Sequence, residues 1–200
     1  KEKISISIVD VSFISAMGPP GGGRTYITNR LVRHFNLVTY SSMSESDITM
    51  IYTKILNAFL RGYSESIVEA IPRIVKASID LYNYIEQTLL PTPDRSHYTF
   101  NLRDMANVFQ GVCSSEAKKI TEYTSIVKLW AHENLRVFGD RLINEDDGKL
   151  LNGAINEKIQ KDFNLEPSQV FEHERLIFTH FMNLNLPEEQ KVYEEVTDTE

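Results

Sequence analysis

The chain has 200 residues, of which 42% are hydrophobic and 24% charged, and these values are typical of a folded globular protein. Its net charge of −7 argues against a general nucleic-acid binder, because such proteins carry a basic surface. The single cysteine, Cys113, excludes an internal disulfide and favours an intracellular protein. No apolar run reaches the roughly 18 residues of a membrane span, so we expect neither a nucleic acid nor a membrane as a partner.

The charge is distributed unevenly. Residues 1–40 carry +3, residues 41–139 carry −1 and residues 140–200 carry −9. The acidity therefore belongs to the C-terminal third. The basic residues of the first segment concentrate around Arg24, Arg30 and Arg33, beside a glycine cluster, where a phosphate group is one possible partner.

The first forty residues predict two strands separated by a loop. Residues 4–14 alternate β-branched side chains and then become continuously apolar, as in a strand that enters a buried sheet. Residues 17–23 are rich in proline and glycine, and can form neither a helix nor a central strand. Residues 35–40 are a second, short strand candidate.

Most of the remaining chain is predicted to be helical. Ser44, followed by Asp47, is typical of a helix start. Ser64 begins another helical segment, in which Pro72 predicts a kink or a break. The proline-containing stretch 91–96 is a predicted loop and the best internal boundary.

The segment after this loop is also predicted to be mainly helical. Asn101 is predicted to cap a short helix that ends near Gly111. The further predictions are a helix over 121–142, a turn over 144–148, a helix over 149–163 and a strand over 175–181. The acidic tail from Pro187 is expected to fray.

The glycine-rich segment fits the phosphate-binding pattern G-x-x-x-x-G-K-[ST] from Gly18 to Thr25, except that Arg24 replaces the lysine. Two adjacent prolines remove N–H donors from the loop, and the chain offers no run of parallel strands. No apolar strand ends in Asp or Glu to hold Mg²⁺. We therefore interpret the segment as a glycine-rich loop that is not a true P-loop.

Other catalytic motifs are incomplete. His132 and Glu133 begin the H-E-x-x-H motif of zinc proteases, but Arg136 stands where the second histidine is needed. We interpret the pair as a helix-surface feature with structural ion pairing, and expect no metal site. Cys113 has no basic neighbour in the sequence and is interpreted as a buried, inert thiol.

Three arginines remain as candidate binding residues. Arg30 and Arg33 are three residues apart, so on a helical turn they would share one side and either clamp a phosphate or form surface ion pairs. Arg103 falls in the first turn of a predicted helix, where the helix dipole disfavours a cation. This position suggests an anionic partner, although Asp104 or another nearby carboxylate would also suffice.

Three stretches, in family order, resemble the dynein heavy chain family in the third AAA+ module of its motor ring. They are residues 15–36 with the sequence PPGGGR, residues 96–111 with FNLRD, and residues 129–142 with LWAHE and RVFGDRL. The PPGGGR form is similar to the axonemal branch of the family.

The resemblance implies an α/β fragment that is mostly α. Residues 1–90 would be the C-terminal part of an AAA+ large domain, residues 91–186 its α-helical lid, and residues 187–200 an acidic tail or linker to the next module. The family's P-loop and its acidic strand for Mg²⁺ and water would lie before residue 1. We therefore expect this chain alone to be inactive and to hold no nucleotide tightly.

For the intact protein, the resemblance implies an ATP-driven, minus-end-directed microtubule motor of the ciliary or flagellar axoneme, in the cytoplasm. This module would bind ATP or ADP with Mg²⁺ in a regulatory role. The implied partners are the neighbouring AAA+ modules, the microtubule, and dynein light and intermediate chains. The alternative, if the protein begins at Lys1, is a stand-alone helical interaction module whose acidic C-terminal third binds a basic partner.

The resemblance also implies roles for four residues. Arg30 matches the arginine finger that acts on the neighbouring module's nucleotide, and Arg33 is the second arginine of that pair. Arg103 matches the lid arginine that reaches the phosphates of the module's own nucleotide. Gly18 falls at the sensor position, where the family usually has a polar residue that holds the attacking water, and this departure suits a module that holds nucleotide.

Overall fold

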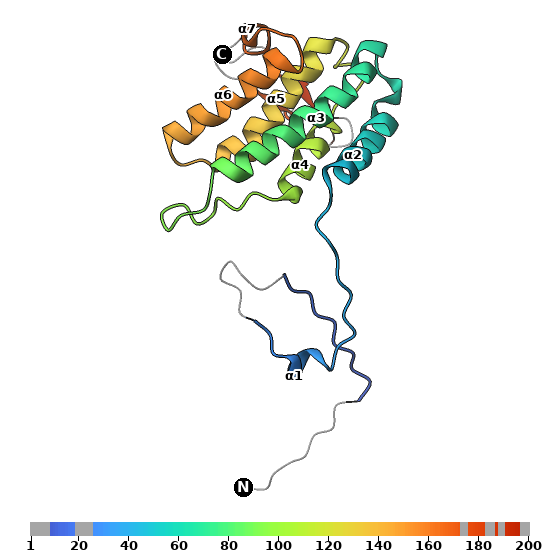
Figure 1. The fold of residues 1–200 in the computed structure, drawn as a ribbon. Helices are drawn as coiled ribbons and strands as arrows, with labels where there is room; N and C mark the ends of the chain where they lie inside the picture. Colours follow the sequence, from blue (N-terminus) through green and yellow to red (C-terminus); the bar gives the residue numbers. More distant parts are fainter. Residues whose placement is uncertain (1–8, 19–25, 173–175, 183–186, 188–190, 197–200) are drawn as a thin grey trace. The chain divides into compact units, whose positions relative to one another are not determined.

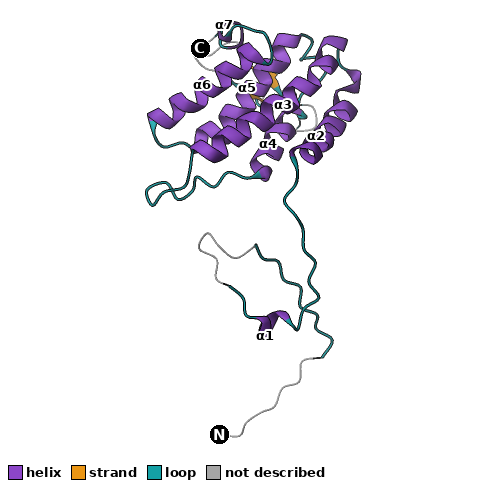
Figure 2. Cartoon of the chain, viewed as in Figure 1, coloured by secondary structure: helices purple, strands orange, loops and turns teal. Residues whose placement is uncertain are grey.

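The computed structural model describes residues 9–18, 26–172, 176–182, 187 and 191–196 (Figure 1). The chain forms two units, residues 1–42 and residues 43–200, and each is described by itself. Helices dominate the second unit, as Figure 2 shows, which confirms the prediction of a mostly α fragment.

The first unit contains one short helix, α1 (Asn29–Val32), within its described part. The strands predicted over residues 4–14 and 35–40 are wrong wherever the structure describes them, while residues 4–8 lie outside the described residues. A strand needs a neighbour for its backbone hydrogen bonds and an apolar surface for its side chains. Neither is present among the described residues of this unit, since Ile14 is 98% exposed.

The second unit begins with two long helices, as predicted. Helix α2 (Glu45–Phe59) starts at Ser44, whose hydroxyl accepts a hydrogen bond from the backbone N–H of Asp47 while the Asp47 carboxylate accepts one from Ser44. This reciprocal pair is a capping box. A 3-10 turn, η1 (Leu60–Gly62), leads into α3 (Glu65–Thr88).

Pro72 does not break α3, which continues for 24 residues. Proline removes one backbone hydrogen bond, but α3 lies at the centre of the unit and packs against α2, α4, α5 and α6. The helix buries eleven of its residues. Tertiary packing therefore outweighs the local cost of the proline.

The next two helices pack against each other, and the first of them carries Arg103. Helix α4 (Leu102–Val112) starts at the predicted cap Asn101 and packs against α5 (Tyr123–Phe138). Helix α5 ends before the predicted residue 142, because a 3-10 turn, η2 (Gly139–Arg141), replaces its last turn.

The turn predicted over residues 144–148 is instead the start of α6 (Glu145–Lys161), and α7 (Pro167–Val170) follows. Three acidic residues, Glu145, Asp146 and Asp147, occupy the first turn of α6, where the positive end of the helix dipole stabilises them. The polar composition that indicated a turn is therefore also that of a helix N-terminus.

A two-stranded antiparallel sheet lies beside the helices. Strand β1 (Phe178–Thr179) pairs with β2 (Glu194–Glu195), with Phe178 opposite Glu195. The strand predicted over 175–181 is therefore shorter than expected. The prediction that the tail frays was wrong for residues 193–195, because β2 is paired with β1 and the Tyr193 ring is buried.

Candidate functional site

The backbone at the start of α4 fixes the position of Arg103. The Asn101 side chain accepts a hydrogen bond from the backbone N–H of Arg103 at 2.8 Å, and the Asp104 carboxylate accepts one from the backbone N–H of Asn101 at 3.0 Å. This capping box holds the first turn, so the exposed Arg103 side chain extends from an ordered backbone.

Asp104 is not the partner of Arg103. Its second carboxylate oxygen pairs with the guanidinium of Arg141 at 3.1 Å. Within the part of the chain that the structure describes, the Arg103 guanidinium makes no hydrogen bond or ion pair. Among the described residues, neither Asp104 nor another carboxylate pairs with Arg103.

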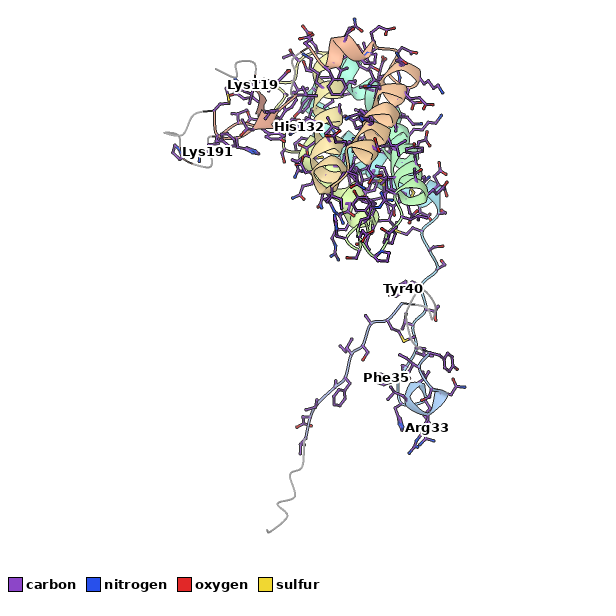
Figure 3. The ribbon with its side chains drawn as sticks, turned by 90° about the vertical axis from the view of Figure 1, so that its left-hand side faces the viewer. Arg33, Phe35, Tyr40, Lys119, His132 and Lys191 are labelled. Carbon is purple, nitrogen blue, oxygen red and sulfur yellow. The ribbon has the colours of Figure 1, made fainter. Side chains whose placement is uncertain are left out.

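The other predicted site residues belong to the first unit, whereas Arg103 belongs to the second. Arg30 lies in α1 and Arg33 directly follows it, and both are exposed. Arg33, labelled in Figure 3, donates a hydrogen bond to the His34 ring at 3.3 Å. Gly18 is partly exposed and outside any helix or strand, whereas Arg24 lies outside the described residues.

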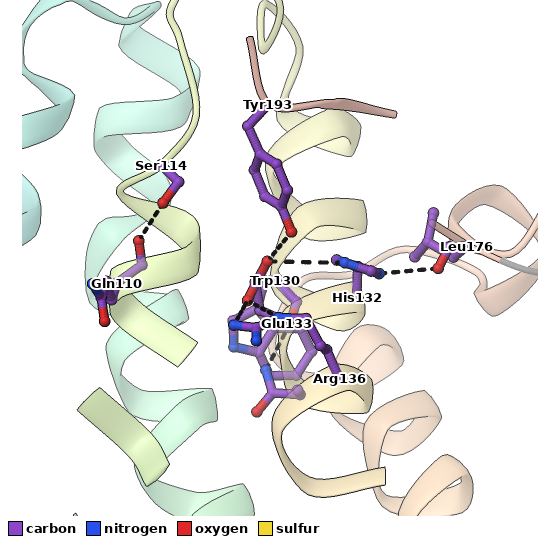
Figure 4. Close-up of polar contacts among 9 residues, drawn as sticks. Gln110, Ser114, Trp130, His132, Glu133, Arg136, Leu176 and Tyr193 are labelled. Carbon is purple, nitrogen blue, oxygen red and sulfur yellow. Dashed lines mark hydrogen bonds and ion pairs between the residues drawn. The ribbon is translucent and has the colours of Figure 1, made fainter. Parts of the chain in front are cut away.

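An ionic cluster surrounds the buried carboxylate of Glu133, which was predicted to lie on the helix surface and to form structural ion pairs. The surface position was wrong, because the Glu133 side chain is 0% exposed, whereas the structural ion pairing is confirmed. Arg136 donates two hydrogen bonds to one carboxylate oxygen at 3.0 and 2.7 Å, and the Tyr193 hydroxyl donates one to the other oxygen at 2.5 Å (Figure 4). A buried carboxylate needs such partners, since removal from water otherwise disfavours its charge.

The sequence contains one signal for this burial. Glu133 follows Ile126 by seven residues and Trp130 by three, so it falls on the apolar face of its helix. A charged residue there predicts a buried partner, and Arg136 at i+3 is in reach. The second partner could not be found in this way, because Tyr193 is sixty residues away.

Tyr193 attaches the C-terminal segment to the helices of the second unit. Burial and then the hydrogen bond to Glu133 raise the pKa of Tyr193 well above its ordinary value, so the hydroxyl remains protonated and donates. Two ion pairs support the attachment, from Lys119 to Glu194 and from Lys128 to Glu195. Residues 193–195 are therefore part of the folded unit.

His132 contacts the same cluster and is 9% exposed. Its Nδ1 lies 3.0 Å from the Leu176 carbonyl oxygen, which can only accept, so Nδ1 carries the proton. Its Nε2 lies 3.9 Å from a Glu133 oxygen (Figure 4). Burial lowers the pKa of His132, against the opposing effects of the Leu176 carbonyl and Glu133.

His132 should make the stability of the protein depend on pH. The pKa of His132 is lower in the folded chain than in the unfolded chain. Its contribution to folding stability is therefore fully present above the unfolded-state pKa of about 6.5 and is lost as the pH falls below that value. We expect the urea midpoint of the 200-residue chain to fall between pH 7 and pH 5, and to fall less in His132→Asn, whose amide can still donate to Leu176. The other charged neighbours of His132, which are Arg136, Glu133 and Asp140, are present in both proteins and cannot cause a difference between them. If the urea midpoints of the two proteins fall in parallel with pH, the assignment of the pH dependence to His132 is wrong.

The described residues show no metal-binding cluster. No three His, Cys, Asp or Glu side chains among them are arranged to hold a metal ion. Cys113 is partly buried and burial raises the pKa of its thiol, so it is a poor nucleophile at neutral pH. No helix in the described ranges has the length and apolar character needed to cross a bilayer.

Two protein-family models match this chain. The AAA+ lid domain family matches residues 74–171, and the family described as the P-loop containing dynein motor region matches residues 1–43. Both matches appear in the order expected from the resemblance.

Similar full-length proteins are axonemal dyneins. Dynein axonemal heavy chain 1 of Rattus norvegicus is 40% identical over 189 residues, which cover 88% of this chain and 4% of that protein. Dynein axonemal heavy chain 6 of Homo sapiens is 37% identical over 96% of this chain and 5% of its own length. Dynein axonemal heavy chain 12 of Rattus norvegicus is 37% identical over 98% of this chain and 7% of its own length.

The chain thus spans less than a tenth of the length of these relatives. The similarity extends over most of this chain and includes both the motor-region segment and the lid helices. We conclude that the chain belongs to the dynein heavy chain family, is homologous to its axonemal members, and contains an AAA+ lid domain.

Proposed function

We propose that this chain is part of the third AAA+ module in the motor ring of an axonemal dynein. Residues 1–90 would complete the large domain, residues 91–186 would form the lid, and residues 187–200 would lead to the next module. The match to the motor-region family followed by the lid family supports this order. The match to the lid family begins at residue 74, before the proposed boundary between residues 90 and 91.

In the intact protein, the module would regulate an ATP-driven, minus-end-directed microtubule motor of the ciliary or flagellar axoneme. Its partners would be the neighbouring AAA+ modules, the microtubule, and light and intermediate chains. The names of the relatives support the axonemal assignment. Gly18 has no polar side chain to hold an attacking water, which favours a module that retains nucleotide.

The observation that carries the proposal is the state of Arg103. Its guanidinium is exposed, has no partner among the described residues, and extends from a capped helix start. These features fit the phosphates of ATP or ADP, bound with Mg²⁺, which would supply the anionic partner. Arg30 and Arg33 are both exposed and lie on one short helical segment. Such exposure is required of two arginines that act on the nucleotide of the neighbouring module.

The test is Arg103→Ala in the full-length heavy chain, with nucleotide binding at the other modules disabled. Loss of a charge-assisted hydrogen bond should weaken retention of a fluorescent ADP analogue by about 10- to 100-fold. Arg61→Ala is a control, because Arg61 is another exposed arginine in the same unit.

Arg30→Ala gives a second comparison. Because Arg30 is proposed to act on the neighbouring module, its loss should leave ADP retention at this module unchanged. Retention that is unaffected by Arg103→Ala would remove Arg103 from the site.

A further inference from the structure

Arg141 connects the end of α5 to the segment that leads into α4. It lies in the turn η2 and its Nη2 donates a hydrogen bond to the His97 carbonyl oxygen at 2.8 Å. His97 returns a hydrogen bond from its ring Nε2 to the Arg141 carbonyl oxygen at 3.0 Å. The Arg141 guanidinium also lies 4.9 Å from the centre of the Phe100 ring, within the range of a cation–π contact.

The Arg141 guanidinium also forms an ion pair with Asp104, whose carboxylate is the closest in sequence to Arg103. One oxygen of Asp104 accepts the backbone N–H of Asn101, and the other pairs with Nη1 of Arg141 at 3.1 Å. Both oxygens of Asp104 are therefore engaged. Without Arg141, Asp104 would lose the contact that ties the first turn of α4, which carries Arg103, to the end of α5.

We propose that Arg141 is a positioning residue for Arg103. It holds residues 97–104 against the end of α5 through His97, Phe100 and Asp104, and so fixes the helix turn from which Arg103 reaches an anionic phosphate ligand. The inference rests on the proposed function, because it assumes that Arg103 contacts the nucleotide.

Arg141 is not itself a ligand in this arrangement. Its donors are directed at the His97 carbonyl and the Asp104 carboxylate, and one face of its guanidinium lies near Phe100. A planar guanidinium can make these contacts together, whereas the ammonium of lysine cannot reach all of them at once. The positioning role of residue 141 therefore requires the planar guanidinium of arginine in addition to a positive charge.

A double-mutant cycle in the full-length heavy chain tests the proposal, with the other modules disabled as above and a fluorescent ADP analogue as the probe. Arg141→Gln alone should weaken ADP binding by about 3- to 10-fold, a coupling typical of residues in one network. Combined with Arg103→Ala, it should cause no further loss, because Arg141 acts through Arg103. Arg141→Lys should bind ADP with intermediate affinity, and it serves in place of Arg141→Gln if that variant does not fold.

Arg95→Gln is the matched control for a purely structural effect. Arg95 also ties this loop to a helix, through an ion pair with Asp147 of α6 at 2.5 Å, and the pair is buried to a similar degree. It should lower the melting temperature without weakening ADP binding.

Three results would overturn the proposal. They are unchanged ADP binding in the Arg141 variants, losses that add to that of Arg103→Ala, or an equal loss of ADP binding in Arg95→Gln. Unchanged binding in Arg103→Ala itself identifies a failure of the proposed function, on which the inference depends.

Discussion

Replacing Trp130 with alanine is expected to lower the free energy of unfolding of the chain by about 3–5 kcal/mol. Trp130 is fully buried in α5, and its ring centre lies 5.0 Å from that of Phe163. Its indole N–H donates to the Ser78 hydroxyl at 2.9 Å, which joins α5 to α3. Alanine would leave a cavity and remove this hydrogen bond, and urea unfolding of the 200-residue chain measures the loss.

Two variants separate the contributions at this position. Trp130→Phe keeps most of the ring and should cost less than the alanine variant, because the Ser78 hydroxyl still donates to the Ile74 carbonyl. Tyr84→Ala in α3 removes another large aromatic ring, but one that is 40% exposed, and should cost less than about 1 kcal/mol. Equal losses for Trp130→Ala and Tyr84→Ala would show that the core around α5 is not packed as described.

Replacing Gly111 with alanine is expected to destabilise the chain by about 2–4 kcal/mol, even though alanine is the better helix former. Gly111 lies in α4 directly against Glu133, and an added Cβ would overlap the Glu133 carboxylate. This carboxylate is the end of a flexible side chain, but Arg136 and Tyr193 hold both of its oxygens. It can move only by breaking part-buried, charge-assisted hydrogen bonds from Arg136 and the buried one from Tyr193, and thermal unfolding would report the loss.

The same substitution at Gly153 is a matched control. Gly153 lies inside α6 and a Cβ there would meet no atom within 4 Å, so alanine should stabilise the chain by about 0.5–1 kcal/mol. In a Glu133→Ala background, Gly111→Ala should lose most of its cost because the overlapping group is gone. If both glycine variants are stabilising, Glu133 does not occupy the position described.

The helix starts at Ser44 and Asn101 and the family were predictable from the sequence because their signals are local. Ser44 and Asn101 each bond a residue three or fewer positions away, so the caps follow from neighbouring residues alone. The stretches that carry the family resemblance are likewise continuous. They led to Arg103 as a candidate before its surroundings were known.

Several of the errors share a physical cause, since the structure there depends on a distant partner. The N-terminal strands were predicted from alternation, but a strand forms only when a neighbour completes its hydrogen bonds. Of the kink or break predicted at Pro72, the break is absent, because burial against four helices keeps α3 continuous. The tail was expected to fray because it is acidic, but lysines of the lid pair with its carboxylates.

The sequence by itself determined a mostly helical member of the dynein heavy chain family and the arginines that could meet a phosphate. Only the tertiary structure decided which charges are free and which are engaged. Asp104 is adjacent to Arg103 in the chain, yet it pairs with Arg141, and Glu133 is buried against Tyr193 from the far end. Charge pairing depends on distances in space and on burial, and neither can be obtained from the order of the residues.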